Sequence, residues 1–273
     1  MLNYTVVGGN GFIGTSISES LRSLGHNVWI PKKGCVEVID KPNNIIIYCA
    51  GNGDCDNNSL KVFEANLNYL VEILQAGNFK KLIYLSSTRL YMGQKSSSED
   101  CELTIRSSDT RRLFNLTKLT AEEMLLKSCK NIAIVRPSNV YGVALSSPLF
   151  LPAITRNAIN HGVVDMYVSK DYAKDYVAVE DVAEMVINIS LSESLSHQIY
   201  NIASGSNTTA SEIAEVLQSE TGCKVNWHKS SVDEQFPVTD ISRIQKEFNF
   251  KPRMVLSDLR SMVDNFKANI QHG

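Results

Sequence analysis

The 273-residue sequence has no long run of apolar residues and no large excess of charge of either sign. A membrane-spanning helix needs about 20 consecutive apolar residues, so we expect no transmembrane segment and no membrane partner. Lys and Arg number 27 against 29 Asp and Glu, a net charge of −2. Because a phosphate backbone is bound through a surplus of basic side chains, we also expect no nucleic-acid partner.

The sequence also lacks cysteine pairs with metal-binding spacing. Its six cysteines are scattered, with no Cys-x-x-Cys pair and no Cys/His cluster: Cys35, Cys49, Cys55, Cys101, Cys129 and Cys223. We therefore predict no metal site. Unpaired cysteines and the lack of a signal-like apolar segment near Met1 predict a reduced, cytoplasmic protein.

Short apolar runs alternate with amphipathic segments, which predicts an α/β fold with a parallel sheet covered by helices. The expected strands are residues 4–7, 27–30, 45–49, 81–86 and 132–136, and the expected helices include 60–74, 111–127 and one that begins at 179. The helix at 60–74 is expected to bury an apolar face with three- and four-residue spacing. This face comprises Leu60, Phe63, Leu67, Leu70, Val71 and Leu74.

This pattern favours a Rossmann-type, doubly wound parallel sheet with a small C-terminal α/β substrate lobe. We expect the nucleotide-binding domain at residues 1–142, continued by 176–203. The substrate lobe is expected at 143–175 and 204–273, where short helices follow start signals such as the capping-box pair Thr209 and Glu212.

A glycine-rich turn, GGNGFIG, follows the first expected strand and opens a helix. Gly8, Gly11 and Gly14 allow the backbone to turn tightly and to approach a pyrophosphate, while the helix N-terminus offers free N–H groups. Phe12 and Ile13 belong to the same turn. The arrangement predicts a dinucleotide site.

The end of the second strand indicates which dinucleotide binds. An acidic residue there accepts from the ribose hydroxyls of NAD, but this chain has Lys32 and Lys33. Two ammonium groups can pair with a 2′-phosphate, so we predict NADP and keep NAD as the alternative. Two solvated surface lysines are the simpler explanation of the same residues.

Seven further motifs follow the glycine turn in order: CAGNGD (49–54), LSSTRLYMG (85–93), FNLTK (114–118), VRPSNVYG (135–142), KDYVAVEDVA (174–183), IYNIASG (199–205) and DISRIQKEFNFKPRM (240–254). Together they resemble the extended short-chain dehydrogenase/reductase family over nearly the whole chain. The resemblance implies an NAD(P)-dependent enzyme that modifies a nucleotide-sugar substrate. It also implies a homodimer formed through the two long helices.

The resemblance further implies a catalytic set of serine, tyrosine and lysine. The matching positions are Ser87, Phe114 and Lys118, and phenylalanine has no hydroxyl with which to exchange a proton. Loss of a general acid typically costs about 10²- to 10⁴-fold in rate. Three explanations stay open: an introduced Tyr→Phe change, a protein that binds cofactor without chemistry, or a natural variant whose proton donor is Tyr91, Tyr141, or Arg89 acting through water.

Other site residues follow from the matched motifs. The implied cofactor contacts, besides the glycine turn and the two lysines, are Ala50, Gly51, Ser86, Lys118 and Pro137. The implied substrate contacts are Ser87, Thr88, Arg89, Asn139, Arg156 and Lys174. Lys174 would contact the nucleotide diphosphate, although a surface charge beside a helix explains it nearly as well.

The two residues after Ser87 disfavour two of the reaction types known in this family. The 4,6-dehydratases of the family have two carboxylates there, and Thr88 and Arg89 cannot take those roles. The epimerase-reductases resembling GDP-fucose synthase have a cysteine where Arg89 stands. The short 34–44 stretch omits a strand-helix unit, as in some 4-keto-sugar reductases. We therefore expect a reductase of a nucleotide-linked 4-keto-6-deoxy sugar. The alternatives are a 4-epimerase with tightly bound NAD and a non-catalytic NAD(P)-binding sensor or scaffold.

Overall fold

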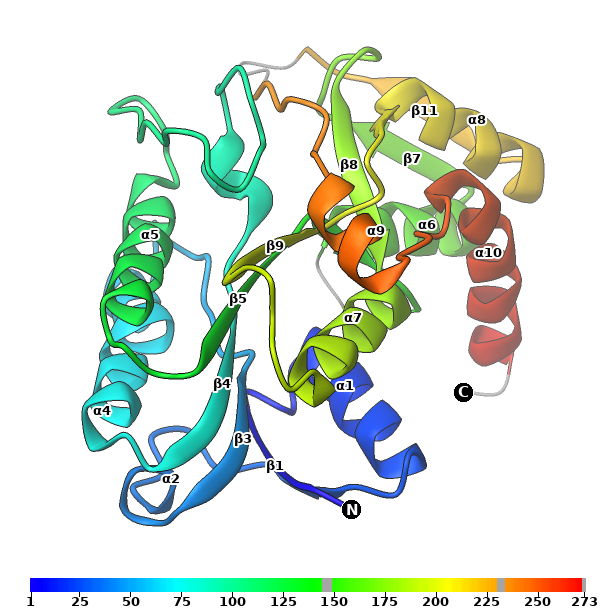
Figure 1. The fold of residues 1–273 in the computed structure, drawn as a ribbon. Coiled ribbons are helices and arrows are strands. Elements are labelled where there is room, and N and C mark those ends of the chain that lie inside the picture. The colour runs from blue at the N-terminus through cyan, green and yellow to red at the C-terminus, as the bar shows by residue number, and fades with distance from the viewer. Residues whose placement is uncertain (144–148, 230–233, 272–273) are drawn as a thin grey trace.

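The computed structural model describes residues 1–143, 149–229 and 234–271 (Figure 1). A central sheet of six parallel strands has the order β2-β1-β3-β4-β5-β9. Its strands are β1 (Asn3–Val7), β2 (Asn27–Trp29), β3 (Asn43–Tyr48), β4 (Phe79–Leu85), β5 (Ile132–Pro137) and β9 (Ile199–Ile202). All five predicted strands are confirmed, within the one or two residues by which strand ends vary.

Helices cover both faces of this sheet, so the predicted doubly wound architecture is confirmed (Figure 1). α1 (Phe12–Ser23) and α7 (Val179–Leu191) pack on one face, and α4 (Tyr69–Ala76) and α5 (Arg112–Leu126) on the other. Successive strand residues point to opposite faces. In β3, for example, Ile47 packs under α1 and α7 while Ile46 packs under α4.

Strand order reverses between β1 and β3, and this is where the site forms. β2 lies on one side of β1 and the later strands lie on the other. The connection from β2 to β3 contains only the short helix α2 (Glu37–Asp40), which confirms the missing strand-helix unit. In doubly wound sheets ligands bind at such a switch point, outside the carboxyl ends of the strands.

The predicted helix at 60–74 is interrupted. It consists of α3 (Ser59–Phe63), a π-helical turn η1 (Glu64–Asn68) and α4. The expected apolar face is therefore wrong at its start, because Leu60 is 77% exposed and Phe63 is 45% exposed. A π turn adds a residue to the helix and rotates the side chains before it relative to those after it.

A second lobe, at the upper right of Figure 1, carries its own apolar core. Its strands form a three-stranded sheet, β10-β8-β6, and a two-stranded sheet, β11-β7. Its elements are β6 (Asn139–Tyr141), α6 (Phe150–His161), β7 (Val163–Met166), β8 (Ala173–Ala178), β10 (Asn207–Thr209), α8 (Ala210–Thr221), β11 (Lys224–Trp227) and α10 (Val255–Gln271), while α9 (Ser242–Phe248) packs against β9. The Thr209–Glu212 capping box is confirmed.

One buried carboxylate ties this lobe to the central sheet. Asp175 of β8 accepts hydrogen bonds from the Ser138 hydroxyl at 2.6 Å and from the backbone N–H groups of Ser204 and Gly205. Ser138 follows β5, and Ser204 follows β9. The ends of two central strands are thereby fixed against the strand that carries Lys174. Across the described ranges, no helix is long and apolar enough to cross a bilayer.

Candidate active site

Two adjoining cavities open at the carboxyl ends of the central strands. We call the cavity of about 650 Å³, which reaches the second lobe, the main cleft. The cavity of about 610 Å³ beside β2 and η1 is the side cleft. Five residues line both: Gly8, Gly11, Cys49, Gly51 and Asn52. The glycine turn therefore stands where the two clefts meet.

The backbone of the glycine turn leaves no room for side chains. Gly8 has φ +81°, and a Cβ there would lie 2.6 Å from the backbone nitrogen of Ala50. A Cβ on Gly14 would lie 2.3 Å from the carbonyl oxygen of Gly8. α1 begins after Gly11 with no side-chain cap and no acidic residue in its first turn. Its free N–H groups and positive helix end fit the pyrophosphate of a dinucleotide.

Every predicted cofactor residue lines one of the two clefts. Those in the main cleft are Gly8, Gly11, Phe12, Ile13, Gly14, Gly51, Ser86, Lys118 and Pro137. Lys32, Lys33 and Ala50 line the side cleft. Lys33 forms an exposed ion pair of 3.4 Å with Glu64, so one of the two lysines already has a carboxylate partner.

Lys118 enters the main cleft from α5 and is fully buried. Its Nζ donates to the backbone oxygen of Leu85 at 2.7 Å and lies 4.6 Å from the ring centroid of Tyr84. Burial lowers the pKa of Lys118 to about 8, because a low-dielectric environment penalises the ammonium form. Lys118 can therefore hold a polar ligand group deep in the cleft.

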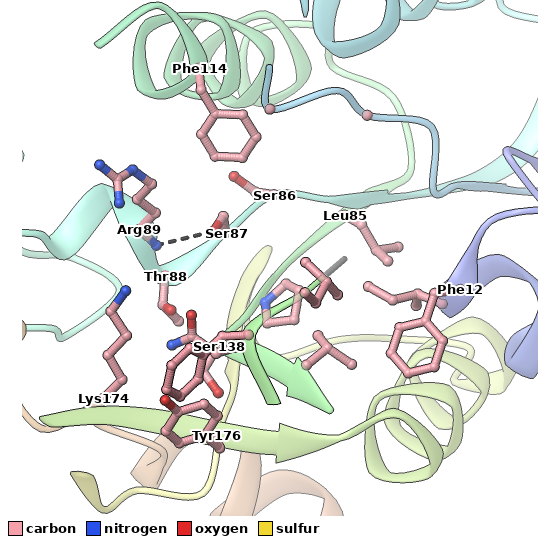
Figure 2. Close-up of a pocket in the computed structure, with 18 of the residues that line it drawn as sticks. Phe12, Leu85, Ser86, Ser87, Thr88, Arg89, Phe114, Ser138, Lys174 and Tyr176 are labelled. Atoms are coloured by element: carbon pink, nitrogen blue, oxygen red, sulfur yellow. Dashed lines mark hydrogen bonds between the residues drawn. The ribbon is translucent and has the colours of Figure 1, made fainter. Parts of the chain in front are cut away.

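Phe114 lies one helical turn before Lys118, and its ring points toward Ser86 and Ser87 at the end of β4 (Figure 2). Ser87 Oγ accepts from the backbone N–H of Arg89 at 3.1 Å. Ser86 Oγ is buried and has no hydrogen-bond partner among the described residues. The ring thus stands beside the two serines and 5.9 Å from the Lys118 ammonium.

Two of the alternative proton donors have hydroxyls that are engaged within the protein. The Tyr91 hydroxyl donates to Asn201 at 2.8 Å and accepts from Arg136, within a buried network. The Tyr141 hydroxyl donates to Asp258 at 2.9 Å. Neither tyrosine is among the described residues that line the clefts, because each hydroxyl is turned toward a partner inside the protein. Arg89, the third alternative, does line the main cleft.

Most predicted substrate residues meet in the main cleft. Ser87, Thr88, Arg89, Asn139 and Lys174 line it. Arg156 is not among the described residues that line the cleft, to which α6 contributes only its first turn, residues 150–152. Its substrate contact stays a prediction. Lys174 is not the surface charge that was its simpler explanation, because its side chain is 18% exposed.

Several site residues carry no signal that the sequence interpretation used. Arg111 lines the main cleft, and the central carbon of its guanidinium group lies 4.8 Å from the centroid of the Phe114 ring. Arg111 is the residue directly before α5, three positions ahead of Phe114. Asn66 in η1 accepts from the backbone N–H of Asn52 at 2.9 Å and donates to Thr117. It thereby fixes the loop after β3 to the helix that carries Lys118.

Glu234 was missed as well. Its carboxylate forms ion pairs with Arg89 at 2.7 Å and with Lys174 at 3.2 Å, and it accepts from the Tyr172 hydroxyl at 3.0 Å. Burial alone would raise the pKa of Glu234, but the hydrogen bond from Arg89 and the charge of Lys174 lower it to about 2. No pattern around residue 234 points to these partners, which are far away in the sequence.

Comparisons with known proteins show the family of the chain. The family model "NAD dependent epimerase/dehydratase family" matches residues 4–203. The chain is 25% identical to the probable GDP-L-fucose synthase 1 of Oryza sativa subsp. japonica, over 98% of this chain and 92% of that protein. It is also 25% identical to the UDP-glucuronate 4-epimerase of Thermodesulfobacterium geofontis, over 74% of this chain and 64% of that protein.

Solved structures show the same fold. MoeE5 in complex with UDP-glucuronic acid and NAD superimposes with a TM-score of 0.84 at 18% identity, covering 98% of this chain and 99% of that one. The UDP-glucose 4-epimerase of Thermus thermophilus in complex with NAD gives a TM-score of 0.78 at 21% identity, covering 97% and 99%. With the family model matched across the central sheet and both clefts, the chain belongs to the NAD-dependent epimerase/dehydratase family, whose members are enzymes of the extended short-chain dehydrogenase/reductase type.

Proposed function

We propose that this protein is an NADP-dependent reductase of a nucleotide-linked 4-keto-6-deoxy sugar. The observation that carries the proposal is the convergence of Ser87, Phe114 and Lys118 on one cleft that begins at the glycine turn. In this arrangement the cofactor lies along the glycine turn, and the sugar reaches the end of β4 from the second lobe.

Each residue has a defined part in this reaction. The glycine turn and Lys118 would hold the cofactor, which when bound would supply a hydride to the carbonyl carbon. The carbonyl oxygen would take its proton from water, because position 114 has no phenol. Ser87 donates a hydrogen bond to that oxygen, which stabilises its developing charge. Lys118 binds the nicotinamide ribose. Phe114 has no proton to give, so the chain works far below the rate that a tyrosine would allow.

The lysines of the side cleft support NADP. Lys32 and Lys33 line this cavity, and no acidic residue follows β2 before them. NAD is the alternative, because the structures of MoeE5 and of the Thermus thermophilus epimerase contain it. The Lys33–Glu64 ion pair is weak enough at the surface to give way to a phosphate.

The main cleft supports a nucleotide-sugar substrate. Lys174 from β8, Asn139 from β6 and Thr88 all line this cleft. We expect Lys174 to contact the diphosphate, and Asn139 and Thr88 to contact the sugar. Arg89 stands where a dehydratase of the family has a carboxylate base, so removal of water is not supported. The proposed substrate lobe comprises residues 143–175 and 204–273.

Two other functions fit specific observations. A 4-epimerase with tightly bound NAD fits the curated relatives. It predicts a nicotinamide cofactor that stays with the protein through gel filtration.

A non-catalytic NAD(P)-binding sensor or scaffold fits Phe114. It predicts tight NADPH binding without turnover, even after tyrosine is restored at position 114.

We place the enzyme in the cytoplasm as a homodimer. All six cysteines are free, which fits a reducing compartment. α3 packs against α5, and both helices carry exposed apolar side chains: Leu60, Phe63, Leu116 and Met124. Apolar side chains gathered on adjacent helices favour a contact with a second copy.

The function is tested by following NADPH oxidation with a panel of nucleotide 4-keto-6-deoxy sugars. Consumption with one member, enhanced in Phe114→Tyr, supports the reductase. If neither protein consumes NADPH with any member, the reductase is excluded.

A further inference from the structure

Three cationic side chains crowd one wall of the main cleft. Arg89, Arg111 and Lys174 all line it, and Figure 2 shows Arg89 and Lys174 on the same side of the cavity. Burial and the neighbouring charge of Arg89 lower the pKa of Arg111. Cations of like sign that are buried or partly buried repel one another, so carboxylates beside them stabilise this wall.

The protein supplies that anion from its own chain. Glu234 bridges Arg89 and Lys174 with one carboxylate oxygen each, at 2.7 and 3.2 Å. The Tyr172 hydroxyl donates to the oxygen that faces Lys174, at 3.0 Å. The carboxylate therefore receives hydrogen bonds as a bound oxyanion would.

The cations and the anion differ in how firmly they are held. Lys174 belongs to β8, and Arg89 belongs to the short helix η2 (Thr88–Tyr91) directly after β4. Glu234 lies in a segment without helix or strand, ahead of α9. The three cations thus sit on or beside regular structure, while their carboxylate partner does not.

Arg89 has a second carboxylate partner besides Glu234. It forms a second ion pair with Asp109 at 2.8 Å, in which both side chains are less than a tenth exposed. Asp109 is itself held by the Asn115 side chain and the backbone N–H of Arg111. The Arg89 Nε is buried and has no hydrogen-bond partner among the described residues. This leaves the wall with a donor that Glu234 does not use.

From these contacts we infer that Arg89, Arg111 and Lys174 form an oxyanion subsite for the substrate, and that Glu234 occupies it until the substrate displaces the carboxylate. The inference rests on the proposed nucleotide-sugar function. Two groups of such a substrate share the required chemistry: the diphosphate of the nucleotide and an acidic group on the sugar. Glu234 then competes with the substrate and selects against neutral ligands.

The test is the binding affinity of Glu234→Gln, measured by calorimetry without cofactor or turnover. The probes are inorganic pyrophosphate, UDP, dTDP, UDP-glucose and UDP-glucuronate. Glu234→Gln should bind at least one diphosphate probe about tenfold more tightly than the unchanged chain. In the unchanged chain the probe must first break the charge-assisted pairs of Glu234, and this cost is absent in the variant. Glu220→Gln is the matched control, because Glu220 pairs with the exposed Arg260, and it should leave all affinities unchanged.

The set of probes distinguishes the diphosphate from an acidic group on the sugar as the source of the oxyanion. Equal tightening of UDP, UDP-glucose and UDP-glucuronate assigns the subsite to the diphosphate. A larger gain for UDP-glucuronate assigns it to an acidic group on the sugar. Glu234→Asp, which keeps the charge, should bind like the unchanged chain. The inference is overturned if Glu234→Gln tightens none of the probes or weakens them. If Glu234→Gln binds a probe more tightly but no variant consumes NADPH, the proposed reductase function is excluded and the oxyanion subsite is still supported.

Discussion

The Nζ of Lys118 lies 5.9 Å from the centroid of the Phe114 ring, one turn further along α5. The two side chains stand where the family resemblance places a lysine and a tyrosine. Lys118 is completely buried and contacts backbone rather than a phenol oxygen. The buried ammonium of Lys118 therefore stands beside a ring that carries no hydroxyl.

Burial of Lys118 predicts a pH dependence of stability. Its pKa is about 8 in the folded protein against about 10.5 when exposed. Between these values the unfolded chain binds more protons, so the free energy of unfolding rises with pH over this range. Compared with Lys118→Met, the unchanged chain should gain stability from pH 8 to pH 10.5 in denaturant titrations. Parallel curves for the two proteins would show that Lys118 ionises as an exposed lysine does.

Substitution of the side-cleft lysines should separate the two cofactors. In Lys32→Ala/Lys33→Ala, NADPH should bind about tenfold or more weakly, because charge-assisted bonds to the 2′-phosphate are lost. NADH lacks that phosphate and serves as the internal control, with unchanged affinity. Fluorescence titration measures both. Equal weakening of the two cofactors, or no weakening of NADPH, would favour NAD as the cofactor.

The exposed apolar side chains of α3 and α5 should hold a dimer together. Leu60 is 77% exposed and Leu116 is 39% exposed, so Leu60→Glu/Leu116→Glu introduces charge without disturbing the core. We expect a dimer for the unchanged chain and a monomer for this variant, measured by light scattering after size-exclusion chromatography. Leu24→Glu, at the end of α1 and also exposed, is the control and should stay dimeric. A monomeric unchanged chain would contradict the prediction.

The fold was largely predictable because local signals agreed with it. The strand before Gly8, the helix after Gly11 and the Thr209–Glu212 capping box are all visible within a few residues. The exposure of Leu60 and Phe63 was not predictable, because a π turn leaves no mark on residue spacing until the packing is known.

The candidate site was also only partly predictable from the sequence. Residues within matched motifs, such as Ser87 and Lys118, line the main cleft as expected. Tyr91 stands in a matched motif too, but its hydroxyl turns inward to Asn201. The contact of Glu234 with Arg89 depends on how two distant segments fold together, and neither segment carries a local signal for it.

The central claim is that position 114 is the place of the proton donor in a reductase. Its most direct test is the rate of NADPH oxidation by the unchanged chain and by Phe114→Tyr, with the panel of nucleotide 4-keto-6-deoxy sugars. Phe150→Tyr, which adds a hydroxyl at another position of the main cleft, is the matched control.

The account predicts that Phe114→Tyr raises turnover of one substrate by about 10²- to 10⁴-fold, while Phe150→Tyr leaves it at the level of the unchanged chain. NADPH binding without consumption by all three proteins would contradict the account, since a restored phenol beside Ser87 and Lys118 would then have no reduction to assist.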